Sequence, residues 1–227
     1  MILICASARA IKQSPSRAVS DHPETVLIKT ESAPQKPVYC CGALVAPNVV
    51  LTAAHCVKGF DKWEVLAPYA KGAPVTVGCK RAMVYPKFRT GSFENDIAVL
   101  ILDGKIAIGR AFPTLYHGEL LRIDTKLVVV GRVDNGAVSP TRAFQTLATV
   151  VQFPGNVNVY GGHPNVTEHG DSGGPVFVSG KEKEIVAVIS GGIQGSQFNV
   201  STDCYSPINR KNRGWILEQV SKVRMPD

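Results

Sequence analysis

The chain has 227 residues, of which 44% are hydrophobic and 19% are charged, and its formal net charge at pH 7 is +7. A chain of this length and apolar content can bury a sizeable core, which argues against an intrinsically disordered protein. Its Lys and Arg residues are scattered, and no stretch matches the ~20 apolar residues of a membrane span, so a solvated basic surface is favoured over a nucleic-acid-binding or membrane-spanning protein.

At the N-terminus, residues 1–10 are largely apolar and end in Ala8-Arg9-Ala10, which has the small-x-small form of a signal-peptidase site. We therefore interpret residues 1–10 as the remnant of a signal peptide and expect a secreted or periplasmic protein. An incidental apolar terminus is the alternative, because the apolar stretch is short and has no basic leader. The 6 cysteines allow a few disulfides and do not make a disulfide-dense scaffold.

Most of the elements predicted along the chain are short strands. Short apolar runs separated by turn residues, together with 21 Gly and 15 Pro, are typical of an all-β protein. In chain order, a strand is expected at residues 25–29, two strands joined by a turn within residues 38–56, and further apolar runs at 98–102, 127–130 and 185–189. Pro113 then marks a link between two halves of similar size. Near the end, Ile216, Val220 and Val223 recur at helical spacing and predict a short closing helix over residues 214–223.

Three motifs carry the residue types of a nucleophilic serine site. They are Leu-Thr-Ala-Ala-His-Cys at 51–56, Asn-Asp-Ile-Ala-Val-Leu at 95–100 and Gly-Asp-Ser-Gly-Gly-Pro at 170–175. A serine hydroxyl needs a base to take its proton and a third group to orient that base, and Ser172, His55 and Asp96 supply these roles. Each motif alone has a simpler interpretation, namely a core histidine, a turn aspartate or a glycine-rich turn. Together and in this order they favour catalysis.

The glycines around Ser172 suit a site that stabilises negative charge. Backbone N–H groups converge on a developing oxyanion only where the chain folds tightly and no side chain blocks the approach. We expect the amides of Gly170 and Ser172 to form this oxyanion hole.

With these motifs in this order, the chain resembles the trypsin/chymotrypsin-like serine proteases over about residues 11–216. The resemblance implies an all-β fold of two antiparallel six-stranded β-barrels with a short C-terminal helix. Residues 11–115 would form the N-terminal barrel, which carries His55 and Asp96. Residues 116–227 would form the C-terminal barrel and closing helix, which carry Ser172, so that both barrels make one peptidase domain.

The same resemblance implies a serine endopeptidase that hydrolyses peptide bonds through an acyl-enzyme intermediate, without a metal or other cofactor. Its partners would be polypeptide substrates and protein protease inhibitors, and it would be a monomer that binds neither nucleic acid nor membrane. The alternative is a catalytically silent relative that acts as a binding protein. Retention of all three triad residues favours the enzyme.

Two further features follow from the resemblance. Cys40 and Cys56 match the family's histidine-loop disulfide, whereas Cys41, Cys79 and Cys204 have no assigned partner. Asp171 matches the aspartate that pairs with the α-amino group exposed on activation, and the corresponding terminus here is Ile11. We hypothesise that signal-peptide removal after residue 10 exposes Ile11, although Ile-Lys-Gln-Ser departs from the family's Ile-Val-Gly-Gly.

The specificity pocket departs from that of a simple trypsin. Val166 stands at the pocket base, where trypsin-like enzymes have Asp. Ser190 and Gly192 stand at positions that line the pocket walls in the family. Gly191 stands between them in place of the usual Trp, which removes an aromatic wall. Asp203, beneath the pocket, would pair with a substrate Lys or Arg, be protonated, or have an internal partner. For the substrate residue before the scissile bond, the sequence favours small or medium aliphatic residues and basic residues about equally.

Two more residues are expected to contact substrate. His169 lies at the pocket entrance, three residues before Ser172, and Phe93 lies three residues before Asp96, where the family lines the neighbouring subsite.

Overall fold

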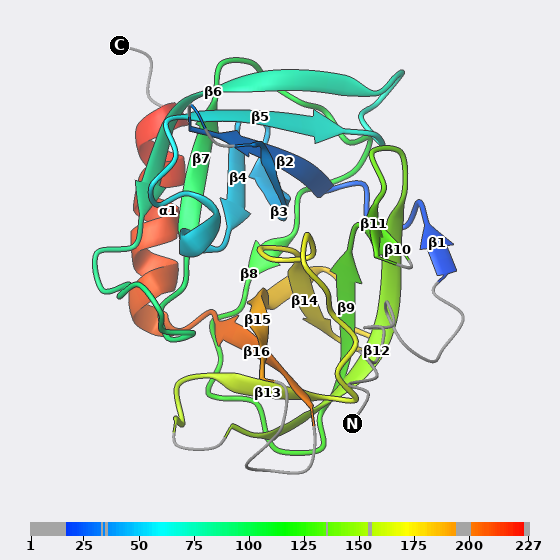
Figure 1. Cartoon of the computed structure of the whole chain (residues 1–227), viewed down its shortest axis with the longest axis vertical. Coiled ribbons are helices and arrows are strands. Elements are labelled where there is room, and N and C mark those ends of the chain that lie inside the picture. The colour runs from blue at the N-terminus through cyan, green and yellow to red at the C-terminus, as the bar shows by residue number, and fades with distance from the viewer. Residues whose placement is uncertain are drawn as a thin grey trace, which may run out of the picture.

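The structure is a computed structural model that describes residues 17–32, 34, 36–134, 136–153, 156–193 and 201–224. Two β-barrels lie next to each other, with the N-terminal barrel in the upper half of Figure 1 and the second barrel in the lower half. The interpreted signal remnant at residues 1–10 and the candidate terminus Ile11 lie outside the described residues.

The first barrel is closed by six antiparallel strands in the spatial order β2, β3, β4, β7, β6, β5. Because successive side chains of a strand point to opposite faces, each strand contributes alternate residues to the interior, among them Ile28, Leu44 and Leu100. A single turn of 3₁₀-helix, Ala54–Cys56, follows β4. The strands are β2 (Thr25–Glu31), β3 (Val38–Ala46), β4 (Val49–Thr52), β5 (Lys62–Ala67), β6 (Val75–Val84) and β7 (Ala98–Leu102).

The second barrel is also a closed ring of six antiparallel strands, because β9 pairs with both β12 and β14 and so joins the two ends of the sheet. These strands are β9 (Lys126–Gly131), β12 (Ala143–Gln152), β13 (Tyr160–His163), β14 (Pro175–Val178), β15 (Glu184–Ile193) and β16 (Thr202–Pro207). Shorter strands flank the two barrels, namely β1 (Arg17–Val19), β8 (Thr114–Leu115), β10 (Val133–Asp134) and β11 (Ala137–Val138). Two six-stranded barrels confirm the fold expected from the sequence.

The chain ends in a single helix, α1 (Arg210–Arg224), which runs along the left side of Figure 1. It begins four residues before the predicted start because Asn209 caps it. The Asn209 Oδ1 accepts hydrogen bonds from the amides of Lys211 and Asn212, at 3.0 and 3.1 Å, which satisfies N–H groups that have no partner within the helix.

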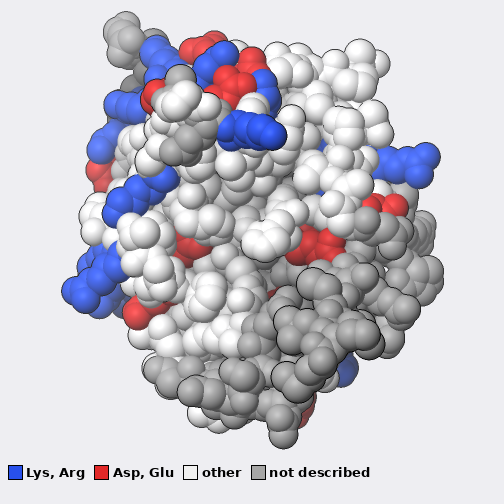
Figure 2. All heavy atoms as spheres, in the orientation of Figure 1, with Lys and Arg blue, Asp and Glu red and all other residues white. Residues whose placement is uncertain are grey.

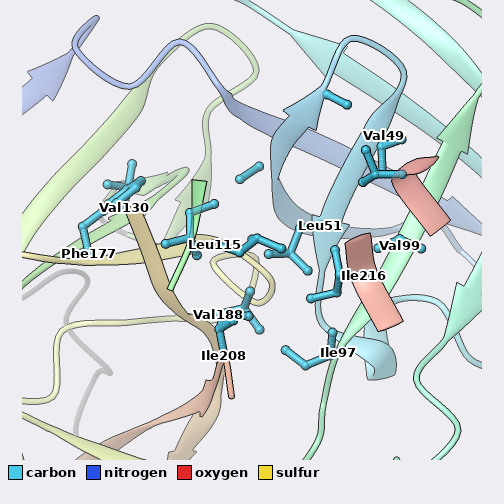
Figure 3. Packing of buried hydrophobic residues seen from close by; sticks show 14 of the residues in the cluster. Val49, Leu51, Ile97, Val99, Leu115, Val130, Phe177, Val188, Ile208 and Ile216 are labelled. Carbon is cyan, nitrogen blue, oxygen red and sulfur yellow. The ribbon is translucent and has the colours of Figure 1, made fainter. Parts of the chain in front are cut away.

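A hydrophobic cluster joins the two barrels to the helix. The first barrel, the second barrel and α1 all contribute fully buried aliphatic side chains to it. Burying a side chain of this kind stabilises the folded chain by roughly 1.5–3 kcal/mol, so the cluster holds the barrels in a fixed relation. Figure 3 labels ten of its members: Val49, Leu51, Ile97, Val99, Leu115, Val130, Phe177, Val188, Ile208 and Ile216.

Charged side chains are unevenly spread over the face shown in Figure 2. Most of the visible Lys and Arg side chains lie along the edge occupied by α1 and the outer strands of the first barrel, with Asp and Glu among them. The middle of this face carries few charges. In the described part of the chain, no helix is long and apolar enough to span a bilayer.

Candidate active site

His55 and Asp96 are brought together by two paired strands. His55 lies in the 3₁₀ turn that follows β4, and Asp96 lies just before β7, which pairs with β4 so that Thr52 faces Ala98. The Asp96 carboxylate accepts a hydrogen bond from the His55 amide at 2.9 Å and contacts the His55 Nδ1 at 2.7 Å. Since a carboxylate only accepts, Nδ1 carries the proton and Nε2 is left as the free base.

The Asp96 carboxylate is also held from the second barrel. The Ser190 hydroxyl, on β15, donates to the Asp96 Oδ2 at 2.5 Å. Asp96 is 1% exposed, and its charge is therefore stabilised by three donors that come from both barrels. This arrangement fixes the plane and tautomer of the imidazole, whose side chain stays 39% exposed at the surface.

Ser172 lies in the loop between β13 and β14, next to the histidine turn. Its carbonyl oxygen accepts a hydrogen bond from the Cys41 amide at 2.7 Å and lies 3.7 Å from the Cys56 sulfur, which is itself 3.6 Å from the His55 Nε2. Ser172 and His55 therefore both lie next to the Cys56 sulfur. Within the described residues, the Ser172 hydroxyl does not hydrogen-bond to Nε2, and such bonds are often long before substrate binds.

The loop before Ser172 leaves two amides free for an oxyanion. Gly170 has φ +112, and a Cβ there would come within 2.9 Å of the Val133 and Val138 side chains, so only glycine suits this position. Neither the Gly170 amide nor the Ser172 amide donates a hydrogen bond within the described part of the chain. Both are available as donors to a developing negative charge.

Gly173 explains how Ser172 comes so close to the first barrel. Its φ is +83, and a Cβ there would overlap the Thr52 hydroxyl and the Cys41 carbonyl oxygen. Any side chain at Gly173 would push the Ser172 loop away from the strand that precedes His55.

Asp171 is fully buried and is bound by backbone amides. Its carboxylate accepts hydrogen bonds from Arg132 N at 2.8 Å, Val133 N at 2.9 Å and Glu168 N at 3.0 Å. Burial raises the pKa of Asp171 to about 7, although these amides oppose the increase. The amino group that the resemblance assigns to it, that of Ile11, lies outside the described residues.

Asp203 has internal partners. It is 0% exposed, and its two oxygens accept hydrogen bonds from the Asn165 side chain, the Val166 amide, the Thr167 amide and hydroxyl, and the Tyr205 hydroxyl. Burial raises the pKa of Asp203, and these donors counteract the increase. Of the alternatives left open by the sequence, an internal partner is the one this geometry matches, because five donors occupy the carboxylate.

An aromatic ring covers the bare backbone at Gly191. A Cβ at Gly191 would come within 2.9 Å of the Phe93 ring, which packs edge-on against Phe153 with ring centroids 5.9 Å apart. Glu94, which follows Phe93 in the chain, accepts a hydrogen bond from the Asn158 side chain at 2.9 Å. The loop before Asp96 is thereby bound to the second barrel, and Phe93 fills space that a large side chain at Gly191 would need.

The other residues expected to contact substrate belong to the second barrel, on β15 and in the loop between β13 and β14. Gly192 pairs with Asp203 across β15 and β16, Val166 is 2% exposed, and His169 is exposed beside Gly170. Val166 contacts Asp203 through its amide, so this apolar side chain and the buried carboxylate belong to one packed unit.

The cysteines divide into one pair and three thiols. Cys40 and Cys56 are joined by a disulfide, as the resemblance implied, and Cys41, Cys79 and Cys204 are free. In the described part of the chain, the one cluster with metal-ligand spacing is Cys40, His55 and Cys56. Because two of these residues form the disulfide, only an imidazole is left for a metal.

Several contacts at the site had no signal in the sequence. Cys41 was left without a role, yet its thiol donates to the Gly170 carbonyl at 3.1 Å. Asn165 and Thr167, which bind Asp203, and Asn158, which binds the loop before Asp96, were also missed. No short motif in the sequence signals these contacts, and only the fold brings these residues to their partners.

Comparison with known proteins identifies the family. The family model described as Trypsin matches residues 11–216. Trypsin Blo t 3 of Blomia tropicalis is 25% identical over 170 residues, which span 63% of this chain and 64% of that protein. Human granzyme M is 29% identical over 205 residues, 74% of this chain and 72% of that protein. A trypsin of Saccharopolyspora erythraea is 27% identical over 183 residues, 72% of this chain and 79% of that protein.

A solved structure titled "Structure of GrC" superposes with a TM-score of 0.71 at 18% identity, covering 91% of this chain and 96% of that chain, and at this identity it shows a shared fold. The family match covers most of the chain, both barrels included. The chain therefore belongs to the trypsin family of serine endopeptidases.

Proposed function

We propose that this protein is a secreted endopeptidase in which Ser172 is the nucleophile, His55 the general base and Asp96 the orienting carboxylate. The observation that carries the proposal is the buried Asp96 carboxylate. It binds the His55 amide and Nδ1 and the Ser190 hydroxyl at once, so that Nε2 faces outward as a base. Structural packing alone would not require a buried charge held by three donors beside a half-exposed imidazole.

The reaction follows from these positions. As the Ser172 oxygen attacks the carbonyl carbon of the scissile peptide bond, Nε2 of His55 takes the hydroxyl proton. The carbonyl oxygen becomes an oxyanion, and the Gly170 and Ser172 amides donate hydrogen bonds to it. The imidazolium, stabilised by Asp96, then protonates the leaving amine. Water attacks the remaining acyl-enzyme by the same route and restores the serine.

For substrate choice, we propose an uncharged residue of small or medium size before the scissile bond. Asp203 is saturated by five internal donors and fully buried, which leaves it no free oxygen for a substrate cation. Placing a Lys or Arg in the pocket would then bury a charge without a partner, which is costly.

Secretion and activation belong to the same proposal. The Cys40–Cys56 disulfide is the kind of bond that persists in oxidising compartments outside the cytosol. Removal of residues 1–10 would expose Ile11, whose amino group could approach the buried Asp171. N-terminal sequencing of the secreted protein tests this route, and a mature terminus other than Ile11 would exclude it.

The activity is tested with a fluorophosphonate probe, which reacts covalently with activated serines. We expect labelling of the wild type, loss of labelling in Ser172→Ala and normal labelling in Ser179→Ala, a control at an exposed serine in the same barrel. An unlabelled wild type, or a Ser172→Ala variant that still reacts, would favour the catalytically silent binding protein. A peptide-library digest then reads the residue before the scissile bond, and a dominant Lys or Arg would refute the substrate choice.

A further inference from the structure

The free thiol of Cys41 lies directly under the loop that precedes Ser172. Cys40 and Cys41 are neighbours on β3, and adjacent residues of a strand point to opposite faces. Cys40 accordingly joins the interior of the first barrel, whereas the fully buried Cys41 side chain reaches the second barrel.

Cys41 contacts this loop at two points. Its amide donates to the Ser172 carbonyl at 2.7 Å, and its thiol donates to the Gly170 carbonyl at 3.1 Å. The carbonyl of Cys41 in turn accepts a hydrogen bond from the Thr52 hydroxyl at 2.7 Å, which anchors this point to β4. Cys41 therefore binds the carbonyls of Gly170 and Ser172, the two residues whose amides we assign to the oxyanion hole.

The thiol contact matters because the Gly170 carbonyl has no substitute partner. Gly170 is buried, and within the described residues the Cys41 thiol is the one donor to its carbonyl. A buried carbonyl without a donor is costly, and a glycine at φ +112 has no side chain to hold its conformation. Without the thiol, the Gly170–Asp171 peptide, which carries this carbonyl, would keep among the described residues only the hydrogen bond from the Asp171 amide to the Glu168 carbonyl, at 3.0 Å. Gly170 links this peptide to the one that carries the Gly170 amide, and with fewer contacts the glycine would rotate more freely and that amide would lose its fixed direction.

The thiol keeps its proton throughout the working range of the protein. Burial and the neighbouring Asp171 carboxylate raise the pKa of Cys41 well above its ordinary value, and the nearby Arg132 opposes this only in part. Cys41 is thus a donor and not a nucleophile.

We propose that Cys41 is a positioning residue, whose thiol holds the Gly170–Asp171 peptide and thereby fixes the backbone of Gly170, so that the Gly170 amide stays directed at the oxyanion. The inference rests on the proposed function, because it assigns a task within that oxyanion hole. The expected consequence is a slower chemical step with little change in substrate binding.

The test compares Cys41→Ala, which removes the donor, with Cys41→Ser, which keeps a donor of similar size. Cys79→Ala is the control, since Cys79 is a free, partly buried thiol on β6 of the first barrel. We expect Cys41→Ala to lower kcat about fivefold, the effect of about one neutral hydrogen bond, with KM unchanged. Cys41→Ser and Cys79→Ala should keep the wild-type kcat. An unchanged kcat in Cys41→Ala, or an equal loss in Cys41→Ser, would overturn the inference.

A second measurement does not depend on activity. The infrared S–H stretching band of Cys41, identified by its loss in Cys41→Ser, should lie at lower frequency than the band of Cys204, whose sulfur is 4.0 Å from its nearest acceptor, the Thr202 carbonyl. A Cys41 band at the same or higher frequency would contradict the contact. Because this band can be read in an inactive chain, a failure of the catalytic proposal and a failure of this one are distinguishable.

Discussion

The carboxyl group of Asp171 is expected to set part of the pH dependence of folding. Burial raises its pKa from 3.8 to about 7 in the folded chain, whereas an unfolded chain releases this proton near pH ~3.9. Between about pH 4 and pH 7, the folded chain therefore binds one more proton than the unfolded chain. The stabilisation from this proton is complete below the unfolded pKa and is lost as the pH rises through the folded pKa.

The size of the effect follows from the same shift. About three pKa units, at about 1.4 kcal/mol per unit, correspond to about 4 kcal/mol in the free energy of unfolding. Asp171→Asn cannot ionise, so its stability relative to the wild type should rise by up to about 4 kcal/mol between pH ~4 and pH values above ~7. A constant offset is expected beside this rise, because one Asn atom is an NH2 group that cannot accept the hydrogen bonds made by the carboxylate.

Urea unfolding at a series of pH values measures this difference. The unprocessed chain is used in a Ser172→Ala background, which prevents self-cleavage and keeps the Ile11 amino group blocked. Asp203, whose pKa is also raised, is present in both proteins and cancels in the comparison. A stability difference that does not change with pH, or that favours the wild type as the pH rises, would refute the reasoning.

Three further predictions concern the contacts around the site. Ser190→Ala removes a donor to the Asp96 carboxylate and should lower kcat/KM for a peptide amide about tenfold, the effect of one hydrogen bond to a charged group; an unchanged kcat/KM would contradict this role. Gly173→Ala should unfold at a much lower temperature than wild type, because its Cβ would overlap the first barrel, whereas Gly180→Ala, at a similar φ of +80 with nothing within 4 Å, should lose only about 1 kcal/mol. Equal losses in these two variants would show that the overlap is unimportant. Gly191→Ala should destabilise the wild type more than it destabilises the Phe93→Ala variant, because that variant lacks the ring that lies 2.9 Å from the added Cβ. If the two substitutions have additive effects on the free energy of unfolding in urea, this contact is unimportant.

Much of the fold could be predicted from local patterns. The apolar run at residues 98–102 is β7 itself, and the run at 25–29 lies within β2. The closing helix was predicted too short, because the spacing of its apolar residues shows which face is buried and does not show where the helix begins. Asn209 lies outside that period, and its role as the cap depends on side-chain geometry at the end of β16.

The candidate triad residues could be named from the sequence, because each lies in a short motif whose neighbours suit the proposed role. Gly170 and Gly173 are required by backbone angles and close approach, and His55 lies three residues after the end of a buried strand. The positive φ of these glycines is a requirement of the local chain and so leaves a readable pattern, whereas their close approaches to Val133, Thr52 and Cys41 come from distant segments.

The partners of the buried polar groups were decided by the tertiary structure. From the sequence, Asp203 was as suitable for a substrate cation as for an internal partner, and only the approach of residues 165–167 and Tyr205 supplies its five donors. Likewise, the register of β3 turns Cys41 toward Gly170, and the packing of the two barrels brings Phe93 over Gly191. The sequence by itself determined which residues can do chemistry, since that depends on residue type and near neighbours. Which acceptors are already occupied depends on distant segments meeting in space, and no local pattern records that.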